Sequence, residues 1–133
     1  MLYLTRRERF SAAHRLWKES FDKEKNEDIY GECSNFHGHN YVLEVTVKGK
    51  NDPESSFVIN LKTLSKIIRE HIISKLDHKF LNDIEMLEGK TPTSENLSLV
   101  IWEELKDKIP NAELFSVKIY ETENNCVEYR GED

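Results

Sequence analysis

Alternating apolar and polar residues mark four stretches of the chain as β-strands, each with one face turned towards a core. The alternation is clearest over residues 40–49, where Leu43, Val45 and Val47 fall on the same face. The other predicted strands cover residues 2–10, 114–122 and 126–130, and residues 57–59 form a short additional one. These strands are expected to pair into one sheet.

Helical spacing of apolar residues replaces the alternation in two stretches. The first follows Asn60, a residue type that caps helix N-termini, and is expected to run to about residue 76. The second follows Thr93 or Ser94, either of which can cap it, and Pro110 ends it. Because helices with one apolar face need a sheet to cover, the pattern predicts an α+β fold with two helices on one face of the sheet.

Two segments between these elements show neither pattern. Residues 17–32 are polar and rich in charge, and they predict a long surface loop with room for a short helix. Residues 80–90 are expected to form a second loop. The chain contains no repeat or internal linker, so we expect residues 1–133 to form a single domain.

Composition and charge narrow the class of protein. The chain has 19 basic and 25 acidic residues, a net charge of −6, which argues against nucleic acid or an anionic membrane as its main partner. No run approaches the ~20 apolar residues of a membrane helix, and the N-terminus lacks the apolar region of a signal peptide. Cys33 and Cys126 are therefore expected to be free thiols in a cytoplasmic protein.

Three of the five histidines can be brought together by the predicted strands. His37 and His39 are two residues apart at the start of a strand, which points both imidazoles to one face. His14 follows the first strand, and antiparallel pairing of these two strands places it beside the other two. Three imidazoles without an obvious fourth ligand describe an open, catalytic type of zinc site.

Two other interpretations of this histidine pattern stay open. A His-x-His pair is a weak motif, and most such pairs bind no metal. Cys33 precedes His37 by four residues, a spacing that also permits a closed, purely structural site with three histidines and one cysteine as ligands. In that case the chain would be a non-catalytic domain.

Further candidates for chemistry lie at the ends of the predicted elements. A Cys33 thiol beside a metal ion would have a lowered pKa and could act as a base, although it could equally be an ordinary loop cysteine. Asp77 and His78 close the first helix, where a histidine also serves as a simple C-terminal cap. Adjacent residues of a helix do not face each other, so a working pair requires non-helical backbone here.

Two acidic residues are candidates for binding a substrate. Glu121, near the end of a strand, can accept hydrogen bonds from the paired N–H groups of a guanine or pterin ring. Alternatively, Glu121 is a solvated acid at the end of a strand and binds no substrate. Glu95 could equally be an acid that complements the dipole of the second helix.

Five motifs that occur in order extend this picture. They are FSAAHRL at residues 10–16, C-x₃-HGHNY at 33–41, LDH at 76–78, PTSEN at 92–96 and YET at 120–122. Over residues 2–132 the chain resembles the family of 6-pyruvoyltetrahydropterin and 6-carboxytetrahydropterin synthases. Because several independent motifs agree, this resemblance is far more specific than any one of them.

The resemblance implies the tunnelling fold, a four-stranded antiparallel sheet with two helices on one face. Three subunits would close their sheets into a barrel, and two trimers would stack into a hexamer. The implied roles are zinc ligands His14, His37 and His39; catalytic residues Cys33, Asp77 and His78; and substrate-binding residues Glu121, Thr93, Ser94 and Glu95. Asp77 and His78 would serve the site of a neighbouring subunit, and the substrate would be 7,8-dihydroneopterin triphosphate.

The resemblance leaves a choice between products. The three-residue gap between Cys33 and His37 resembles the bacterial enzymes that make 6-carboxy-5,6,7,8-tetrahydropterin for queuosine synthesis, so we expect that product. Residues 3–7, 121–125 and 129–132 resemble instead the enzymes of tetrahydrobiopterin synthesis, which eliminate triphosphate to form the 6-pyruvoyl product. Relatives that make a folate precursor carry Glu in place of the cysteine, which disfavours that activity here.

Overall fold

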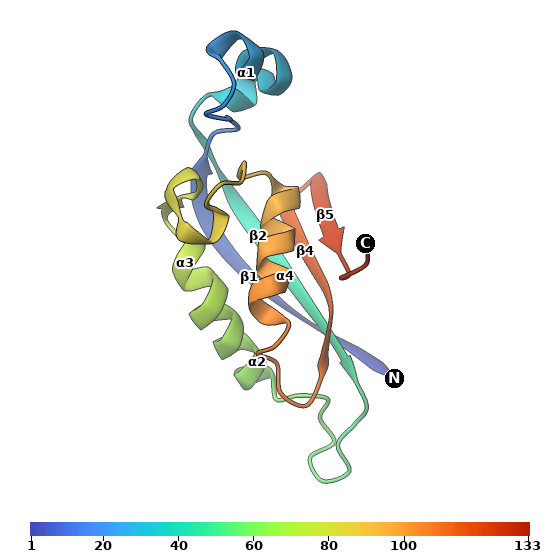
Figure 1. Cartoon of the computed structure of the whole chain (residues 1–133). Coiled ribbons are helices and arrows are strands. Elements are labelled where there is room, and N and C mark those ends of the chain that lie inside the picture. Colours follow the sequence, from blue (N-terminus) through green and yellow to red (C-terminus); the bar gives the residue numbers. More distant parts are fainter.

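The computed structural model describes residues 1–133 and contains one five-stranded sheet, three helices and short 3₁₀ turns (Figure 1). The strands are β1 (Leu2–His14), β2 (His37–Gly49), β3 (Lys79–Phe80), β4 (Glu113–Thr122) and β5 (Asn125–Tyr129), in the sheet order β3-β1-β2-β4-β5. The helices are α1 (Lys23–Tyr30), α2 (Leu61–Ile68) with its continuation to Leu76, and α4 (Ser94–Leu105). None of them is both long and apolar enough to cross a membrane.

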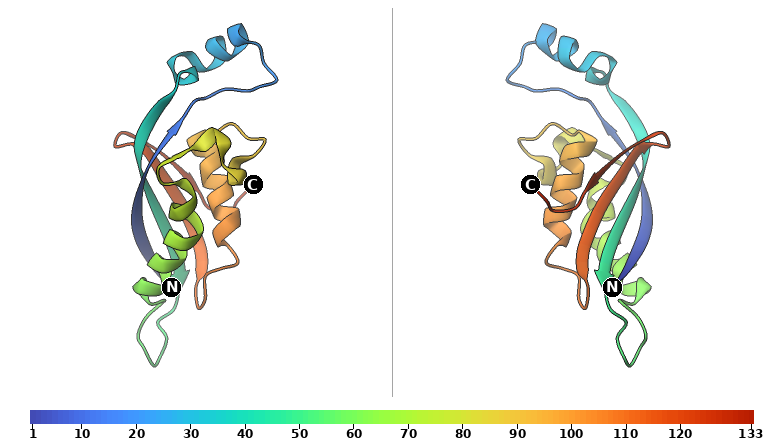
Figure 2. Two further views of the ribbon diagram at one scale, coloured as in Figure 1. Left: turned by 90° about the vertical axis from the view of Figure 1, so that its left-hand side faces the viewer. Right: turned by 90° about the vertical axis from the view of Figure 1, so that its right-hand side faces the viewer.

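The helices α2 and α4 cover one face of the sheet and leave the other face bare (Figure 2). The core lies between these two layers, and the inward residues of β2, namely Tyr41, Leu43, Val45 and Val47, are completely buried in it. The segment between β1 and β2, which includes α1, projects beyond one end of the sheet (Figures 1 and 2). The α+β prediction and the placement of two helices on one face are therefore confirmed.

The long strands β1 and β2 pair antiparallel along their full length, as expected. The register sets Leu2 opposite Gly49 and continues without a break to His14 opposite His37. Both strands run three to four residues further than the alternation alone indicated, up to the histidines. The end of this pair carries the candidate metal ligands.

The continuation of α2 explains how its apolar face stays on the sheet. Its fully buried residues are four apart, at Leu64, Ile68, Ile72 and Leu76. In a regular α-helix, positions four apart drift around the axis by about 40° each time. A wider π-helical turn, η2 (Arg69–Ile73), precedes the final turn α3 (Ser74–Leu76) and absorbs this drift. The chain therefore leaves the helix at Leu76, beside the edge of β1.

Two predictions about the strands were wrong. Residues 57–59 form no strand; Val58 and Ile59 are apolar because they pack on the core within an irregular connection. The sheet has five strands rather than four, because β3 adds to the free edge of β1 in parallel, with Ala12 opposite Lys79 and Ala13 opposite Phe80. A two-residue strand carries no alternation from which it could have been predicted.

The helical predictions were closer. Asn60 caps α2 by accepting a hydrogen bond from the backbone of Lys62, and the polar segment before β2 contains the short helix α1. α4 ends at Leu105 and not at Pro110, because the following residues tighten into a turn in which the Lys108 N–H bonds to the Leu105 carbonyl.

A buried carboxylate joins the sheet to α2. Glu8 faces the helical layer and accepts hydrogen bonds from Arg6 Nε at 2.6 Å, Arg69 Nε at 3.0 Å and Ser65 Oγ at 3.2 Å. Burial acts to raise the pKa of Glu8, but the two guanidinium groups outweigh it and hold the pKa below its usual value. The charge is therefore retained and compensated inside the interface.

Replacing Glu8 with alanine is expected to lower the free energy of unfolding by about 2 kcal/mol. Two guanidinium groups lose their common partner, and the partly exposed Arg6 and Arg69 recover only part of that loss from water. Urea denaturation measures the change. The matched control is Glu44→Ala, which breaks the exposed pair with Arg7 and should cost less than about 1 kcal/mol. Equal losses in both variants would contradict the assigned role of Glu8.

Candidate metal centre

Three histidine side chains meet where β1 ends and β2 begins. His14 and His37 lie opposite each other in the register, and His39 lies opposite Ala12 on the same face. One ring nitrogen of each histidine lies within 4.8 Å of one ring nitrogen of the other two. The cluster predicted from the strand pattern is therefore present, and it could hold a metal ion.

Backbone carbonyls orient two of the three rings. His14 Nδ1 lies 2.9 Å from the carbonyl oxygen of Pro92, and His37 Nδ1 lies 2.7 Å from that of Asn35. A ring that donates from Nδ1 keeps its Nε2 lone pair free, which is the usual arrangement of a metal-binding histidine. This role of Pro92 and Asn35 could not be predicted from the sequence, because their backbone carbonyls and not their side chains make the contacts.

The chemistry of these nitrogens fits a metal ion. His14 Nε2 and His39 Nε2 are buried and have no hydrogen-bond partner, which is costly unless something else satisfies them. Burial also lowers the pKa of both imidazoles, and so favours the neutral form that binds metals. Three neutral imidazoles suit zinc among the common divalent ions.

Cys33 is not part of this cluster. It lies in the 3₁₀ turn η1 (Gly31–Ser34), and its side chain is exposed. The geometry therefore does not support a closed site with three histidines and one cysteine as ligands. A metal ion held by the three histidines alone would have a coordination position open for a water molecule or a substrate.

A carboxylate adjoins the histidines. Glu121, at the end of β4, accepts a hydrogen bond from Ser94 Oγ at 2.9 Å through one oxygen. Its other oxygen lies 3.5 Å from His39 Nε2. The side chain is about one-third exposed, at 32%. An acceptor for paired N–H groups thus stands beside the candidate metal ligands.

The N-cap and first two residues of α4 contribute unequally to this region. Thr93 is the N-cap of the helix and accepts a hydrogen bond from the Asn96 N–H at 3.1 Å. Ser94 is buried and contacts Glu121, whereas Glu95 is exposed in the first turn. Of the three predicted residues, Ser94 is the one that the structure joins to Glu121.

Asp77 and His78 form the pair that the sequence permitted only with non-helical backbone. Asp77 is extended, with ψ at 130°, and His78 has a left-handed φ of 60°. Their side chains meet at 3.0 Å, between His78 Nδ1 and Asp77 Oδ2. The Ser11 N–H bonds to Asp77 Oδ1 at 2.9 Å and, with the His78 ring, holds the pKa of the Asp77 carboxyl below its usual value.

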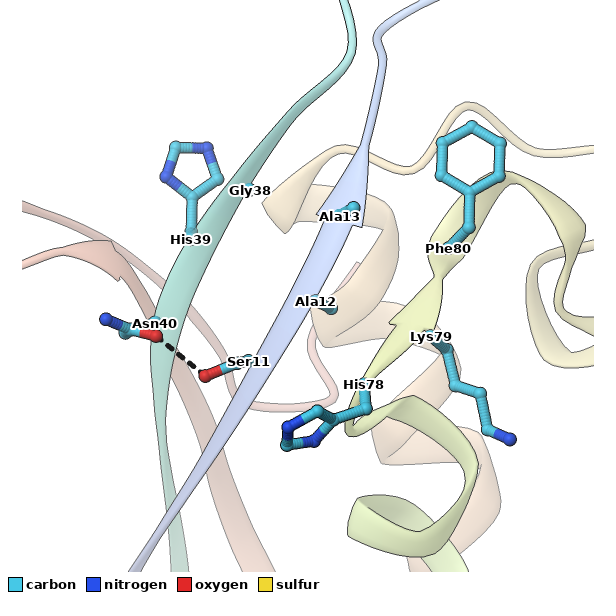
Figure 3. Close-up of a pocket in the computed structure, with 9 residues that line it drawn as sticks. All are labelled: Ser11, Ala12, Ala13, Gly38, His39, Asn40, His78, Lys79 and Phe80. Atoms are coloured by element: carbon cyan, nitrogen blue, oxygen red, sulfur yellow. Dashed lines mark hydrogen bonds between the residues drawn. The ribbon is translucent and has the colours of Figure 1, made fainter.

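Within one chain this pair stands apart from the carboxylate of Glu121. Asp77 and His78 lie at the β3 edge of the sheet, and Glu121 lies on β4, three strand spacings or about 14 Å away. β1 separates His78 from His39, and both line a cavity of about 490 Å³ along that strand (Figure 3). The His78 side chain is 84% exposed at this free edge.

Comparison with known proteins gives consistent matches over the whole chain. The family model described as 6-pyruvoyl tetrahydropterin synthase matches residues 3–132. The 6-pyruvoyl tetrahydrobiopterin synthase of Dictyostelium discoideum is 49% identical over 130 residues, covering 97% of this chain and 96% of that protein. The Homo sapiens protein of the same name is 42% identical over 132 residues, covering 97% and 91%.

A solved structure shows the same likeness in three dimensions. The structure of Caenorhabditis elegans 6-pyruvoyl tetrahydropterin synthase aligns with a TM-score of 0.91 and 36% sequence identity, covering 98% of this chain and 96% of that one. The resemblance expected from the five motifs is confirmed.

These relatives overturn the expected product. The gap between Cys33 and His37 favoured 6-carboxy-5,6,7,8-tetrahydropterin, but the relatives at 49% and 42% identity are both 6-pyruvoyl tetrahydrobiopterin synthases. The gap is the length of a surface turn, from η1 to the start of β2. Loop lengths vary readily among relatives, so this one does not report which product is made.

Proposed function

Because the chain belongs to the 6-pyruvoyl tetrahydropterin synthase family, we propose that it converts 7,8-dihydroneopterin triphosphate into 6-pyruvoyl tetrahydropterin, with release of triphosphate. The observation that carries this proposal is the position of Glu121. Its carboxylate lies 3.5 Å from His39 Nε2 and is held by Ser94. It can therefore anchor the N–H groups of a pterin ring while the side chain of the substrate reaches the histidines.

The residues divide the chemistry between them. His14, His37 and His39 would hold a zinc ion, which when bound withdraws charge from the side-chain hydroxyls of the substrate and acidifies the adjacent C–H groups. Cys33 would remove a proton from carbon. His78, oriented by Asp77, moves protons to and from the substrate oxygens.

The separation of Asp77 and His78 from Glu121 supports a site shared between subunits. An exposed histidine at the free edge of a sheet can reach the site of a second copy of the chain. The outer edge of β5, and that of β1 before the two residues that pair with β3, offer unpaired backbone groups for such contacts. We therefore propose a homo-oligomer, built as a hexamer of two trimers, in which neighbouring subunits complete each site.

Incubation of the purified, zinc-loaded protein with 7,8-dihydroneopterin triphosphate tests the function. We expect release of inorganic triphosphate and a product with the mass of 6-pyruvoyl tetrahydropterin. A 6-carboxy product accompanied by acetaldehyde, or no turnover in the zinc-loaded protein, would contradict the proposal.

The variant Glu121→Gln is expected to bind a non-reacting pterin more weakly by about 2–4 kcal/mol. The amide sets a donor against the N–H donors of the ring and leaves buried groups mispaired. Calorimetric titration of the zinc-loaded protein measures the affinity. The matched control is Glu123→Gln, an exposed carboxylate in the turn after β4, which should bind the pterin normally. Unchanged affinity in Glu121→Gln would remove the anchor role.

Hybrid oligomers test the shared site. Cys33→Ala and His78→Ala variants should each be nearly inactive, but a 1:1 mixture unfolded and reassembled together should recover about one quarter of the wild-type activity. Half of the sites keep Cys33, and half of those receive an intact His78 from a neighbour. Mixed oligomers with no recovered activity would show that each site is built within one subunit.

A further inference from the structure

The turn that carries Cys33 belongs to the segment that projects from the end of the sheet (Figures 1 and 2). In this segment α1 leads directly into η1 (Gly31–Ser34), which returns the chain to β2. A base on such a segment needs specific contacts to keep its distance from the metal ligands constant.

The two residues that follow His14 contact the backbone of Cys33 and of the residue after it. The Leu16 N–H bonds to the carbonyl of Cys33 at 2.7 Å. Arg15 Nε bonds to the carbonyl of Ser34, the next residue, at 2.8 Å. The end of β1 thus holds the backbone around Cys33 at two consecutive carbonyls.

The main chain of Arg15 is itself held by hydrogen bonds that its N–H and its carbonyl form with one side chain, that of Asn82. Its N–H donates to Asn82 Oδ1, and its carbonyl accepts from Asn82 Nδ2, both at 2.9 Å. Its guanidinium carbon lies 3.8 Å from the centre of the Trp17 ring and 4.8 Å from that of Phe36. A planar guanidinium packed against two rings and bonded to a carbonyl is fixed in orientation, which a lysine could not reproduce.

The other end of the turn is tied to a second histidine of the cluster. The Asn35 N–H bonds to the Glu32 carbonyl at 3.1 Å, and the Asn35 carbonyl lies 2.7 Å from His37 Nδ1. The Cys33 turn is therefore connected to His14 through Arg15, its neighbour in the chain, and to His37 through Asn35. Both connections lead from the proposed base to the candidate metal ligands.

We propose that Arg15 is a positioning residue, which together with Asn82 holds the Cys33 turn at a fixed distance from the metal centre. This inference rests on the proposed function, in which Cys33 is the base. Arg15 acts through the backbone of Ser34 and does not need to touch the substrate. A misplacement of about 1 Å in a reacting group costs about 100-fold in rate, so loss of this contact should be visible in kcat.

A competing role for Arg15 can be separated experimentally. Arg15 also lines a cavity of about 580 Å³ together with Lys18 and Lys90, where its charge could attract a phosphate chain. A residue that binds phosphate would act through charge and would change KM. A residue that positions the base would act through geometry and would change kcat.

The test compares three variants with a matched control. Arg15→Gln removes both the charge and the planar guanidinium group, whereas Arg15→Lys keeps only the charge. Asn82→Ala removes the side chain that holds the main chain of Arg15, without changing the net charge. Lys90→Gln removes a charge from the same cavity without touching the turn. In the zinc-loaded protein we expect the first three to lower kcat about 10- to 100-fold at nearly constant KM, and Lys90→Gln to leave kcat unchanged.

A second measurement does not depend on turnover. Amide hydrogen exchange across residues 31–36 should become about tenfold faster or more in both Arg15 variants and in Asn82→Ala, at unchanged zinc content. Raised KM in Arg15→Gln and Lys90→Gln, with normal kinetics in Arg15→Lys, would overturn the proposal in favour of phosphate binding. Unchanged exchange would overturn it even if the wild-type protein made no pyruvoyl product, which would separately contradict the proposed function.

Discussion

Replacing His39 with alanine is expected to strip the metal from the protein and to reduce turnover to background. In the proposed site His39 supplies one of three nitrogen ligands, and its Nε2 is buried without a hydrogen-bond partner. Changes in residues that merely orient ligands cost 10- to 100-fold in metal affinity, so removing a ligand itself should cost more than about 100-fold. Two imidazoles cannot hold zinc well against a chelator.

Metal content per subunit after dialysis against a weak chelator measures this effect. The matched control is His71→Ala, which removes a half-buried histidine of the α2 continuation that lies 4.0 Å from Glu104 of α4. His71→Ala should retain one zinc per subunit. Full metal content in His39→Ala would show that the three-histidine assignment is wrong.

Replacing Cys33 with alanine is expected to lower kcat by about 10²- to 10⁴-fold, the usual cost of losing a general base. The affinity for a non-reacting pterin should remain close to normal, since a base contributes mainly in the transition state. The zinc content should also be unchanged, because Cys33 is exposed and lies outside the histidine cluster.

The second free cysteine provides the control for this variant. Cys126 is also exposed, on β5, and has no proposed role, so Cys126→Ala should keep wild-type kcat. Loss of zinc from Cys33→Ala would instead favour a structural site with a sulfur ligand. Normal kcat in Cys33→Ala would remove the base from the mechanism.

Local patterns were sufficient for four of the five strands, for the two helices on the sheet and for the histidine cluster. The alternation around Val45 placed β2, Asn60 located the start of α2, and the two-residue spacing of His37 and His39 placed both on one face. Antiparallel pairing then brought His14 to them. These features follow from backbone periodicity and nearest-neighbour pairing, which are properties of short stretches of sequence.

The prediction of the product was wrong because it relied on the length of one turn. The spacing between Cys33 and His37 describes only how the chain passes from η1 into β2, whereas the whole-chain relatives at 49% and 42% identity compare every position. A family resemblance was visible in five motifs, but the distinction between products was not carried by any single one of them.

The amino-acid sequence by itself determined the α+β class, the one-sided helices and the three histidines at the junction of β1 and β2. Only the tertiary structure decided that β3 joins the edge of β1, that Asp77 meets His78 on non-helical backbone, and that Arg15 holds the carbonyl of Ser34. These arrangements depend on backbone groups and on residues far apart in the chain. Backbone N–H and C=O groups are nearly the same in every residue, so a pattern of side chains does not predict which of these groups will form hydrogen bonds with each other.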